Sequence, residues 1–335
     1  MDRLDARHIG QAENRDTLGS KLNALKDGDT ITARVQRFTP GEMDGPRYET
    51  FKVPYQKWMR VLDVLIHISE ELDSDLSYRW YCGSKMCGSC AMRVNGREVL
   101  ACWAAAEPDM TIEPLRNLPV MRDLTVDRRP YEKRFLALEP WIHRASPYPG
   151  FPEPLTQREM RFTSEALDCI SCAACYSACP VVGLGEVTKF SGPAPLVQLA
   201  QAALDPRDSR ERWQDLIEQA SVFSCISCYR CEEVCPAGIP IVSKVIEPLK
   251  ALAYRMARDK PRHPRVFLEI VRRRGRIDPS ELVLRVQGMR ALRGFRRVMS
   301  LLLNGKISPW ATLLGKPIPG MQHVRRLFRT LLRTS

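Results

Sequence analysis

The chain has 335 residues, of which 44% are hydrophobic, and a formal net charge of +12 at pH 7. This length and composition favour two or three domains with ordinary cores. The N-terminal residues contain no apolar run, and no stretch of about 18 apolar residues exists, so we expect neither a secretory signal nor a membrane-spanning helix. All 12 cysteines fall into three groups of four. Reduced thiols in a cytosolic compartment suit metal clusters better than structural disulfides.

Positive charge is concentrated at the C-terminal end. Residues 251–335 contain 20 Lys and Arg residues against 4 Asp and Glu residues, a net charge of +16, whereas the rest of the chain carries −4. Such a segment favours an anionic partner: a phospholipid surface, an acidic protein face or nucleic acid. A solvated charged face is the simple alternative. Nucleic acid is the least expected partner because no nucleic-acid-binding fold is recognisable.

The first 26 residues are polar and predict a mobile or partner-bound arm. We expect a domain over residues 27–126 that begins with two strands, at Ile31–Phe38 and Glu49–Val53, joined by a turn rich in Pro and Gly. A helix follows, because apolar residues that we assign to the core repeat at helical spacing: Trp58, Val61, Leu62, Leu65 and Ile68.

A first cysteine group consists of Cys82, Cys87, Cys90 and Cys102. The spacing C-x4-C-x2-C with a distant fourth cysteine is typical of plant-type [2Fe-2S] ferredoxins. A loop around such a cluster needs unusual backbone dihedrals and hydrogen-bond donors to sulfur. We assign these cofactor-binding roles to four residues of the loop: Gly83, Ser84, Gly88 and Ser89. A zinc knuckle is the alternative at this spacing.

Asn95-Gly96 predicts a two-residue hairpin turn between strands at Ala91–Val94 and Arg97–Cys102. This hairpin would return Cys102 to the other three cysteines. A further strand around Met110–Ile112 completes a small β-grasp-like sheet with one helix.

Two further cysteine groups share the spacing C-x2-C-x2-C-x3-C-P and lie 56 residues apart. This spacing is typical of proteins with two [4Fe-4S] clusters, in which the fourth cysteine of each group ligates the other cluster. Cluster one would take Cys169, Cys172, Cys175 and Cys235. Cluster two would take Cys225, Cys228, Cys231 and Cys179. Zinc and disulfides fit less well, because zinc sites use two cysteine pairs with a longer spacer and need no third cysteine two residues on.

Residues 127–252 predict a helical domain in which helix, cysteine group and helix occur twice, and hence a pseudo-twofold arrangement. A Pro-rich connector covers residues 128–154. The expected helices are Tyr131–Leu138, a short helix capped by Thr163, Pro195–Leu204, a helix from about Ser209, and Ile239–Met256 with a bend at Pro248. We assign two cations near the clusters to the solvated surface, Arg230 and Lys244.

Residues 253–335 predict a basic helical extension. We expect helices at Pro264–Arg274, from Asp278 onward, and over Leu282–Leu303. The first of these ends in several arginines, where the helix dipole favours cations.

Residues 82–102 and the run Pro114–Asp127, followed by the paired cysteine groups, resemble the iron–sulfur subunit of succinate dehydrogenase and fumarate reductase. The similarity covers about Asp29–Leu252. It implies an α+β fold, with a β-grasp domain followed by an α-helical ferredoxin domain. It also implies an FAD-containing flavoprotein partner that oxidises succinate or reduces fumarate, and a peripheral position on the cytoplasmic side of the cytoplasmic membrane.

The extension loosely resembles the C-terminal part of the small iron–sulfur subunit of heterodisulfide reductases. That likeness implies a cysteine-rich quinone-reacting subunit in place of the usual membrane anchor.

The sequence departs from this family at the last cysteine group. Most members lack its second cysteine and hold a [3Fe-4S] cluster there, whereas this chain has Cys228, so we predict [4Fe-4S], with [3Fe-4S] as the alternative. The family also tends to place a His after the first cysteine of that group and a Trp after the earlier Cys-Pro, and both help to form a quinone site. This chain has Ile226 at the first place and no aromatic residue at 181–184.

No residue pattern indicates a substrate site, since we find neither paired carboxylates near a His nor a nucleotide-binding glycine loop. The histidines are assigned to surface or core roles: His8, His67, His143, His263 and His323. We therefore predict no catalytic residue and expect single-electron transfer, with the [2Fe-2S] cluster facing the flavoprotein and cluster two facing a quinone or a second redox partner. A scaffold with structural metals, and a relay for a thiol, heterodisulfide or hydroxyacid oxidoreductase, are the alternatives.

Overall fold

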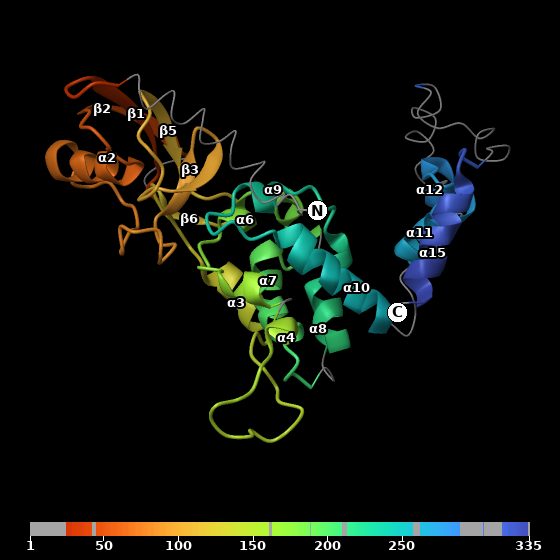
Figure 1. Ribbon diagram of the computed structural model, residues 1–335. Helices are drawn as coiled ribbons and strands as arrows, with labels where there is room; N and C mark the ends of the chain where they lie inside the picture. Colours follow the sequence, from red (N-terminus) through yellow and green to blue (C-terminus); the bar gives the residue numbers. More distant parts are fainter. Residues whose placement is uncertain are drawn as a thin grey trace. The chain divides into compact units, whose positions relative to one another are not determined.

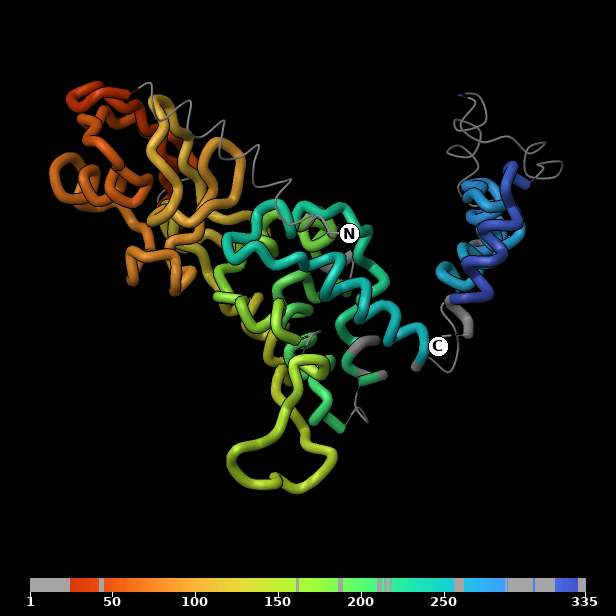
Figure 2. Tube along the Cα trace, in the orientation of Figure 1, coloured from red at the N-terminus to blue at the C-terminus, as the bar shows by residue number. Residues whose placement is uncertain are grey.

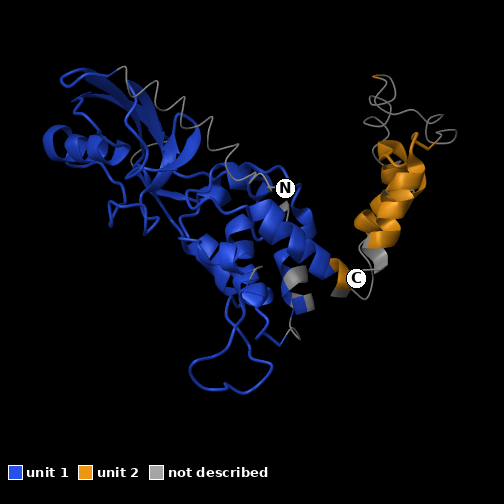
Figure 3. Ribbon diagram, viewed as in Figure 1, with its two compact units in different colours: residues 1–253 blue, residues 254–335 orange. Residues whose placement is uncertain are grey.

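Figure 1 and Figure 2 show the computed structural model of the chain. The structure describes residues 25–41, 45–160, 163–187, 189–209, 213–256, 262–288, 304 and 317–333. Residues 1–24 of the predicted arm, and the predicted helix beyond residue 288, lie outside the described residues. The chain forms two compact units, residues 1–253 and 254–335, coloured separately in Figure 3.

A five-stranded mixed sheet opens the first unit, with the strand order β2-β1-β5-β3-β4. Its strands are β1 (Thr30–Arg37), β2 (Arg47–Pro54), β3 (Ala91–Val94), β4 (Arg97–Leu100) and β5 (Asp109–Glu113). β1 pairs antiparallel with β2 and parallel with β5, and β3 pairs antiparallel with both β4 and β5. Alternate residues of β1, namely Ile31, Ala33 and Val35, are fully buried. Because successive side chains of a strand point to opposite faces of the sheet, a segment with many polar residues can still bury one face in the core.

The expected core helix begins later than its apolar spacing predicted. It consists of α2 (Val61–His67) and a π-helical turn, η2 (Ile68–Leu72). Trp58 lies before it in a turn with φ of 70° and is 70% exposed, so its assignment to the core was wrong. A left-handed residue cannot continue a right-handed helix. The Asp63 carboxylate, which accepts from the Arg60 amide at 2.7 Å, marks the true start.

The predicted hairpin is confirmed. Asn95 and Gly96 have φ of 49° and 80°, the left-handed pair of a type I′ turn, and join β3 to β4. A second small hairpin, β6 (Val120–Arg122) with β7 (Thr125–Val126), was not predicted. Its turn residue Asp123 is 1% exposed and accepts hydrogen bonds from the Phe38 amide and the Arg37 guanidinium. A buried carboxylate thus fixes this hairpin to the end of β1.

Short helices form the rest of the first unit, and together with the sheet they confirm the α+β class. They are α3 (Arg129–Leu136), α4 (Gln157–Met160), α5 (Ser164–Leu167), α6 (Ala174–Ser177), η3 (Val182–Val187), α7 (Pro193–Ala203), α8 (Trp213–Ala220), η4 (Val222–Ser224), α9 (Arg230–Glu233), η5 (Ile241–Ile246) and α10 (Glu247–Met256). All residues of α7 except Gln201 are buried, which makes α7 the central helix. Pro248 is the second residue of α10, which follows the π-helical segment η5 without a gap, and the bend expected at Pro248 stays a prediction.

Two details of this helical region differ from expectation. Thr163 precedes α5 as predicted, but its hydroxyl donates to the Met160 carbonyl oxygen at 3.1 Å and does not cap the helix. The connector forms a long loop, seen at the bottom of Figure 1. An ion pair between Arg144 and Glu153 joins the two arms of this loop. Glu153 also pairs with Arg207, which follows α7.

The second unit contains three described helices: α11 (Arg262–Arg274), α12 (Pro279–Gln287) and α15 (Met321–Arg333). Asp278 caps α12 by accepting from the Glu281 amide at 3.0 Å, which confirms the predicted helix start. Arg274 is buried and pairs with Asp278 at 3.0 Å and Glu281 at 3.3 Å. None of the helices that the structure describes in either unit is long and apolar enough to cross a bilayer.

Candidate iron–sulfur centres

The sheet brings the first cysteine group together. Cys90 ends a long loop directly before β3, and Cys102 follows β4 by two residues. The β3–β4 hairpin therefore places both thiols at its open end, where they are buried. Cys82 and Cys87, on the loop itself, are half-buried.

Backbone amides of this loop point at the cysteine sulfurs. Cys82 Sγ accepts from the amides of Ser84 at 3.4 Å, Met86 at 3.4 Å and Cys87 at 3.3 Å. Two more amides donate to two further sulfurs: that of Lys85 to Cys102 Sγ at 3.4 Å, and that of Ser89 to Cys87 Sγ at 3.5 Å. The loop thus donates hydrogen bonds to three of its four thiols, as a site that carries negative charge on sulfur requires.

Left-handed backbone curls the loop inward. Gly83 and Gly88 have φ of 66° and 71°, as their assignment predicted, and Lys85 has φ of 63° without being a glycine. The amide donors, Ser84 first, lower the pKa of Cys82 to about 6. Burial raises the pKa of Cys90 to about 12. A bound metal ion overrides such differences, because a coordinating thiol is deprotonated outright.

The paired cysteine groups exchange their fourth members in the structure. Four thiols line one cavity together with Ala194, Val197 and Ile241: Cys169, Cys172, Cys175 and Cys235. Four others line a second cavity together with Phe190, Val242 and Ile246: Cys179, Cys225, Cys228 and Cys231. Each cavity takes three cysteines from one group and the last cysteine from the other. The structure therefore brings together the same two sets that the spacing implied.

The local fold makes this exchange possible. The one-turn helices α6 and α9 each carry the third cysteine of a group and pack against each other. Each begins after a left-handed residue, Ala173 or Tyr229. Pro180 and Pro236 follow the fourth cysteines and end these short helical turns.

The two thiol sets suit clusters rather than single ions. Burial raises the pKa of Cys172 to about 11 and that of Cys175 well above the usual value, so uncompensated thiolates are disfavoured here. Among the described residues, no three His, Cys, Asp or Glu side chains converge closely enough for one metal ion. A tetrahedral zinc ion would draw its four sulfurs to about 2.3 Å from one centre. Four thiols at the apolar wall of each cavity match the ligand set of a metal–sulfide cluster.

Sequence reasoning missed several side chains that hold these loops. Asn117 Nδ2 donates to three carbonyl oxygens at the end of α6, those of Tyr176 at 3.0 Å, Ser177 at 2.9 Å and Cys179 at 3.1 Å. Glu232 Oε1 accepts from the amides of Val242 at 2.6 Å and Ser243 at 2.8 Å, at the start of η5. No local pattern could reveal these contacts, because in both cases the partners are separated by a cysteine turn or by tens of residues.

Arg128 is a third missed residue. Its guanidinium donates to the Ser171 carbonyl oxygen at 2.5 Å, between Cys169 and Cys172. It places a cation beside the first thiol cavity. By contrast, Arg230 and Lys244 are exposed, as predicted. The histidines among the described residues lie outside the thiol sites, and His8 lies outside the described residues.

Apolar side chains are exposed around two of the three centres. At the [2Fe-2S] loop, Tyr81, Met86 and Trp103 are 82%, 71% and 55% exposed. We call the two cavities lined by four thiols the first and second cubane sites, in the order in which they were described. At the second, Ile226 and Tyr229 are exposed beside Cys228, the most accessible thiol. Contiguous exposed apolar patches are typical of binding surfaces.

Two family descriptions match this chain. A 2Fe-2S iron-sulfur cluster binding domain matches residues 32–133, and a 4Fe-4S dicluster domain matches residues 165–239. The first span contains the first cysteine group, and the second contains both other groups. The cofactors are therefore one [2Fe-2S] and two [4Fe-4S] clusters, as predicted.

Relatives and a solved structure agree with this. One subunit of the Fumarate reductase (CoM/CoB) of Methanothermobacter marburgensis is 35% identical over 225 residues, which is 67% of this chain and 45% of that protein. The Fumarate reductase iron-sulfur subunit of Haemophilus influenzae is 33% identical over 238 residues, or 66% of this chain and 92% of that protein. A chain of the Mycobacterium smegmatis Sdh1 complex in the apo form matches with a TM-score of 0.64 and 26% identity, over 69% of this chain and 98% of that chain. This chain spans less than half the length of the Methanothermobacter relative.

Proposed function

We propose a function from one premise: the chain belongs to the family of fumarate reductase and succinate dehydrogenase iron–sulfur subunits. In this proposal it relays single electrons between an FAD-containing flavoprotein, which oxidises succinate or reduces fumarate, and a quinone-reacting partner. The observation that carries the proposal is the exchange of Cys179 and Cys235 between the two cavities. In this proposal, the exchange ties the two cluster sites to each other and keeps them close together.

The proposed ligands are all 12 cysteines. Cys82, Cys87, Cys90 and Cys102 would hold the [2Fe-2S] cluster, and the two exchanged sets would hold the [4Fe-4S] clusters. Each such cluster accepts one electron at a time, so a flavin's two electrons can leave singly. The chain's own residues supply the rest: loop amides stabilise charge on sulfur, and apolar walls keep water from the first cubane site.

The two ends of the relay follow from exposure. Tyr81, Met86 and Trp103 are exposed next to the cysteines of the first group, and we assign this part of the surface to the flavoprotein. Ile226 and Tyr229 beside the exposed Cys228 form the other end, which we assign to the quinone-reacting subunit, either a membrane anchor or a cysteine-rich protein. Aromatic residues and Met are enriched in such interfaces.

The identity of the electron donor tests this proposal. We expect the chain to purify with a flavoprotein whose flavin is reduced by succinate, and succinate then to reduce the iron–sulfur centres in the complex. Electron paramagnetic resonance (EPR) spectra recorded before and after succinate give the readout. Reduction by a thiol or a hydroxyacid, without any response to succinate, would instead support the alternative relay.

The second unit supports a peripheral position at an anionic surface. Its described carboxylates, Glu269, Asp278 and Glu281, are each paired with arginine within the unit. On α15, by contrast, Arg325, Arg326 and Arg329 are exposed, with no carboxylate within ion-pair distance among the described residues, and Leu327 beside them is 63% exposed. We propose that α15 binds anionic phospholipid on the cytoplasmic side of the membrane.

Vesicle flotation tests the membrane role. The chain is expected to float with vesicles that contain phosphatidylglycerol and to stay behind with phosphatidylcholine alone. Replacing Arg325, Arg326 and Arg329 by glutamine should weaken binding by about 1 kcal/mol per cation. The matched control removes the same charge from the first unit, at Arg47, Lys52 and Lys57, and should change little. Equal binding to both vesicle types would contradict the proposal that α15 binds anionic phospholipid. So would an equal loss of vesicle binding in the α15 variant and the control variant.

A further inference from the structure

The backbone of Gly88 touches the loop of the first cubane site. Gly88 lies between Cys87 and Cys90 and has φ of 71°. A Cβ at this position would lie 2.8 Å from Cys172 Cβ, 2.9 Å from Cys172 Cα and 2.8 Å from the Ile170 carbonyl oxygen. Two of these three atoms belong to the backbone, so no side-chain rotation can make room. Only glycine permits this approach.

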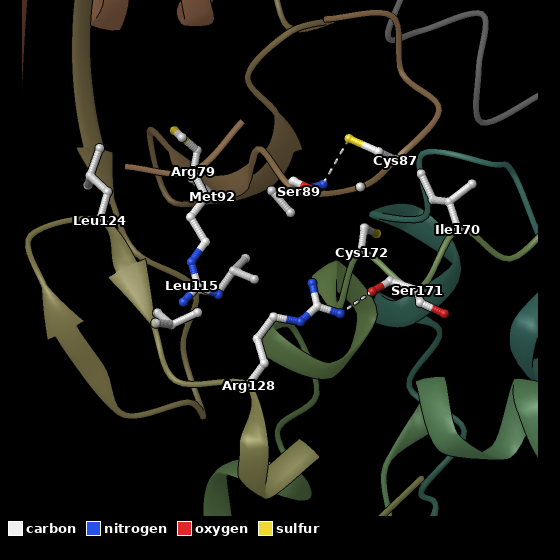
Figure 4. A pocket seen from close by; sticks show the side chains of 13 residues that line it. Arg79, Cys87, Ser89, Met92, Leu115, Leu124, Arg128, Ile170, Ser171 and Cys172 are labelled. Carbon is white, nitrogen blue, oxygen red and sulfur yellow. Dashed lines mark hydrogen bonds between the residues drawn. The ribbon is translucent and has the colours of Figure 1, made fainter. Parts of the chain in front are cut away.

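The contact sits beside a cavity of about 330 Å³ that both loops line (Figure 4). Cys87 and Ser89 reach it from the [2Fe-2S] loop, and Ile170, Ser171 and Cys172 reach it from the first cubane loop. The hydrogen bond from Arg128 to the Ser171 carbonyl, drawn in Figure 4, fixes the second loop at this point. The two loops therefore approach each other at a defined place, between Gly88 and Cys172.

A shared core and hydrogen bonds connect the two loops through the surrounding elements. Cys172 and Ala174 belong to the same buried core as the sheet residues and Cys90. Ser177, on α6, donates to Glu98 on β4 at 2.9 Å and accepts from the Arg116 amide at 2.8 Å. Because the sheet and the helices share one core here, the spacing between the two loops is set by packing and by the missing side chain at residue 88.

We infer that Gly88 is a positioning residue for electron transfer between the [2Fe-2S] cluster and the first [4Fe-4S] cluster, with Cys87 and Cys172 as the facing ligands. The inference rests on the proposed relay function. One electron passes from the reduced to the oxidised cluster, and no bond forms or breaks. Electron tunnelling falls steeply with distance, so a side chain that pushes the loops apart slows the step.

A glycine outside the cluster loops offers a matched control. Gly96, in the β3–β4 turn, also has a left-handed backbone, with φ of 80°, and a Cβ there would meet only the end of the Arg93 side chain, at 3.9 Å. Gly96→Ala therefore introduces similar backbone strain without forcing the two loops apart. Any effect that Gly88→Ala shows beyond Gly96→Ala reports the contact with Cys172.

The test uses the full chain, prepared without air, with iron and sulfide quantified. In fully reduced protein, magnetic coupling between the two clusters, seen as broadening and faster spin relaxation in EPR, should weaken in Gly88→Ala. Intramolecular electron transfer after flash reduction should slow several-fold. Gly96→Ala should resemble the wild type in both measurements. Unchanged coupling and rate in an iron-replete Gly88→Ala protein overturns the inference.

A second measurement covers the case in which Gly88→Ala fails to retain its clusters. In the wild type, the [2Fe-2S] cluster should couple magnetically to the first [4Fe-4S] cluster more strongly than to the second. Stronger coupling to the second cluster, or none to the first, overturns the inference. Failure of the relay function can be told apart from failure of this inference. If the relay function is wrong, the metal of the wild-type protein is not reducible at all.

Discussion

Ser171 and Ser227 have the same left-handed backbone, with φ of 51° at both, although 56 residues separate them. Ala173 and Tyr229 form a second pair at the same separation, with φ of 64°. The repeat of the cysteine groups is therefore also a repeat of backbone conformation. L-residues in this region cost about 1 kcal/mol or more each and persist only where the surroundings hold them. Here the surroundings are the two thiol cavities.

Relief of this strain gives a prediction at Ala173. Ala173→Gly should leave stability unchanged or raise it by up to about 1 kcal/mol, because glycine adopts φ of 64° without cost. The neighbouring Ala174 is equally buried but helical, so Ala174→Gly should lower stability by about 0.5–1 kcal/mol. Thermal unfolding without air measures both. An equal loss in the two variants would show that backbone conformation is not what distinguishes them.

Cys228 decides the type of the second cubane cluster. We predict that Cys228→Ser loses one iron atom per chain and gains the EPR signal of an oxidised [3Fe-4S] cluster, because only three cysteines would then remain in that cavity. The other two clusters should be unaffected. Iron content and EPR spectra that match the wild type would mean that Cys228 is not a ligand.

Arg128 should tune the first cubane cluster. Reduction adds negative charge, and a cation that donates to the Ser171 carbonyl stabilises the reduced form. Arg128→Gln should therefore lower the potential of that cluster by about 50 mV, which is about 1 kcal/mol for a one-electron step. Arg129→Gln is the control, because Arg129 is exposed and pairs with Asp127. A redox titration measures the potential of the first [4Fe-4S] cluster in both variants. Equal potentials would contradict a tuning role for Arg128.

The ion pair between Arg37 and Asp73 gives a prediction about pH. The hydrogen bond from Arg37 holds the pKa of Asp73 below its usual value of 3.8. A depressed carboxyl pKa contributes stability that is fully present above the usual pKa and is lost as pH falls through the lower, folded-state value. Asp73→Asn should therefore cost about 1 kcal/mol, and this cost should stay constant from about pH 8 to about pH 5.

Hydrogen exchange of the β1 amides measures that cost without unfolding the whole chain. The difference between wild type and Asp73→Asn should shrink only below about pH 4. A difference that already fades between about pH 8 and about pH 6 would assign the effect to another titrating group.

The sequence predicted the cysteine sets well because ligand spacing is local and chemically specific. It also predicted the Asn95-Gly96 turn and the start of α12, where one or two residues decide the backbone. It failed at Trp58, because apolar spacing does not reveal a left-handed residue that delays a helix. It missed Asn117 and Arg128, whose partners lie 43 to 62 residues away.

Gly88 illustrates a middle case. Its left-handed backbone was predicted from the needs of a cluster loop, and the structure has it. Its contact with Cys172, 84 residues further along, depends on how the sheet packs against the helices. Local patterns predict conformation, whereas such approaches are set by the tertiary fold.

A redox titration of the chain, purified without air and followed by EPR, tests the central claim most directly. The account predicts three reducible iron–sulfur centres that each take up one electron, one of them with the signal of a [2Fe-2S] cluster. Zinc in place of iron, or iron that remains silent to reductant, would contradict the relay and leave a metal-stabilised scaffold.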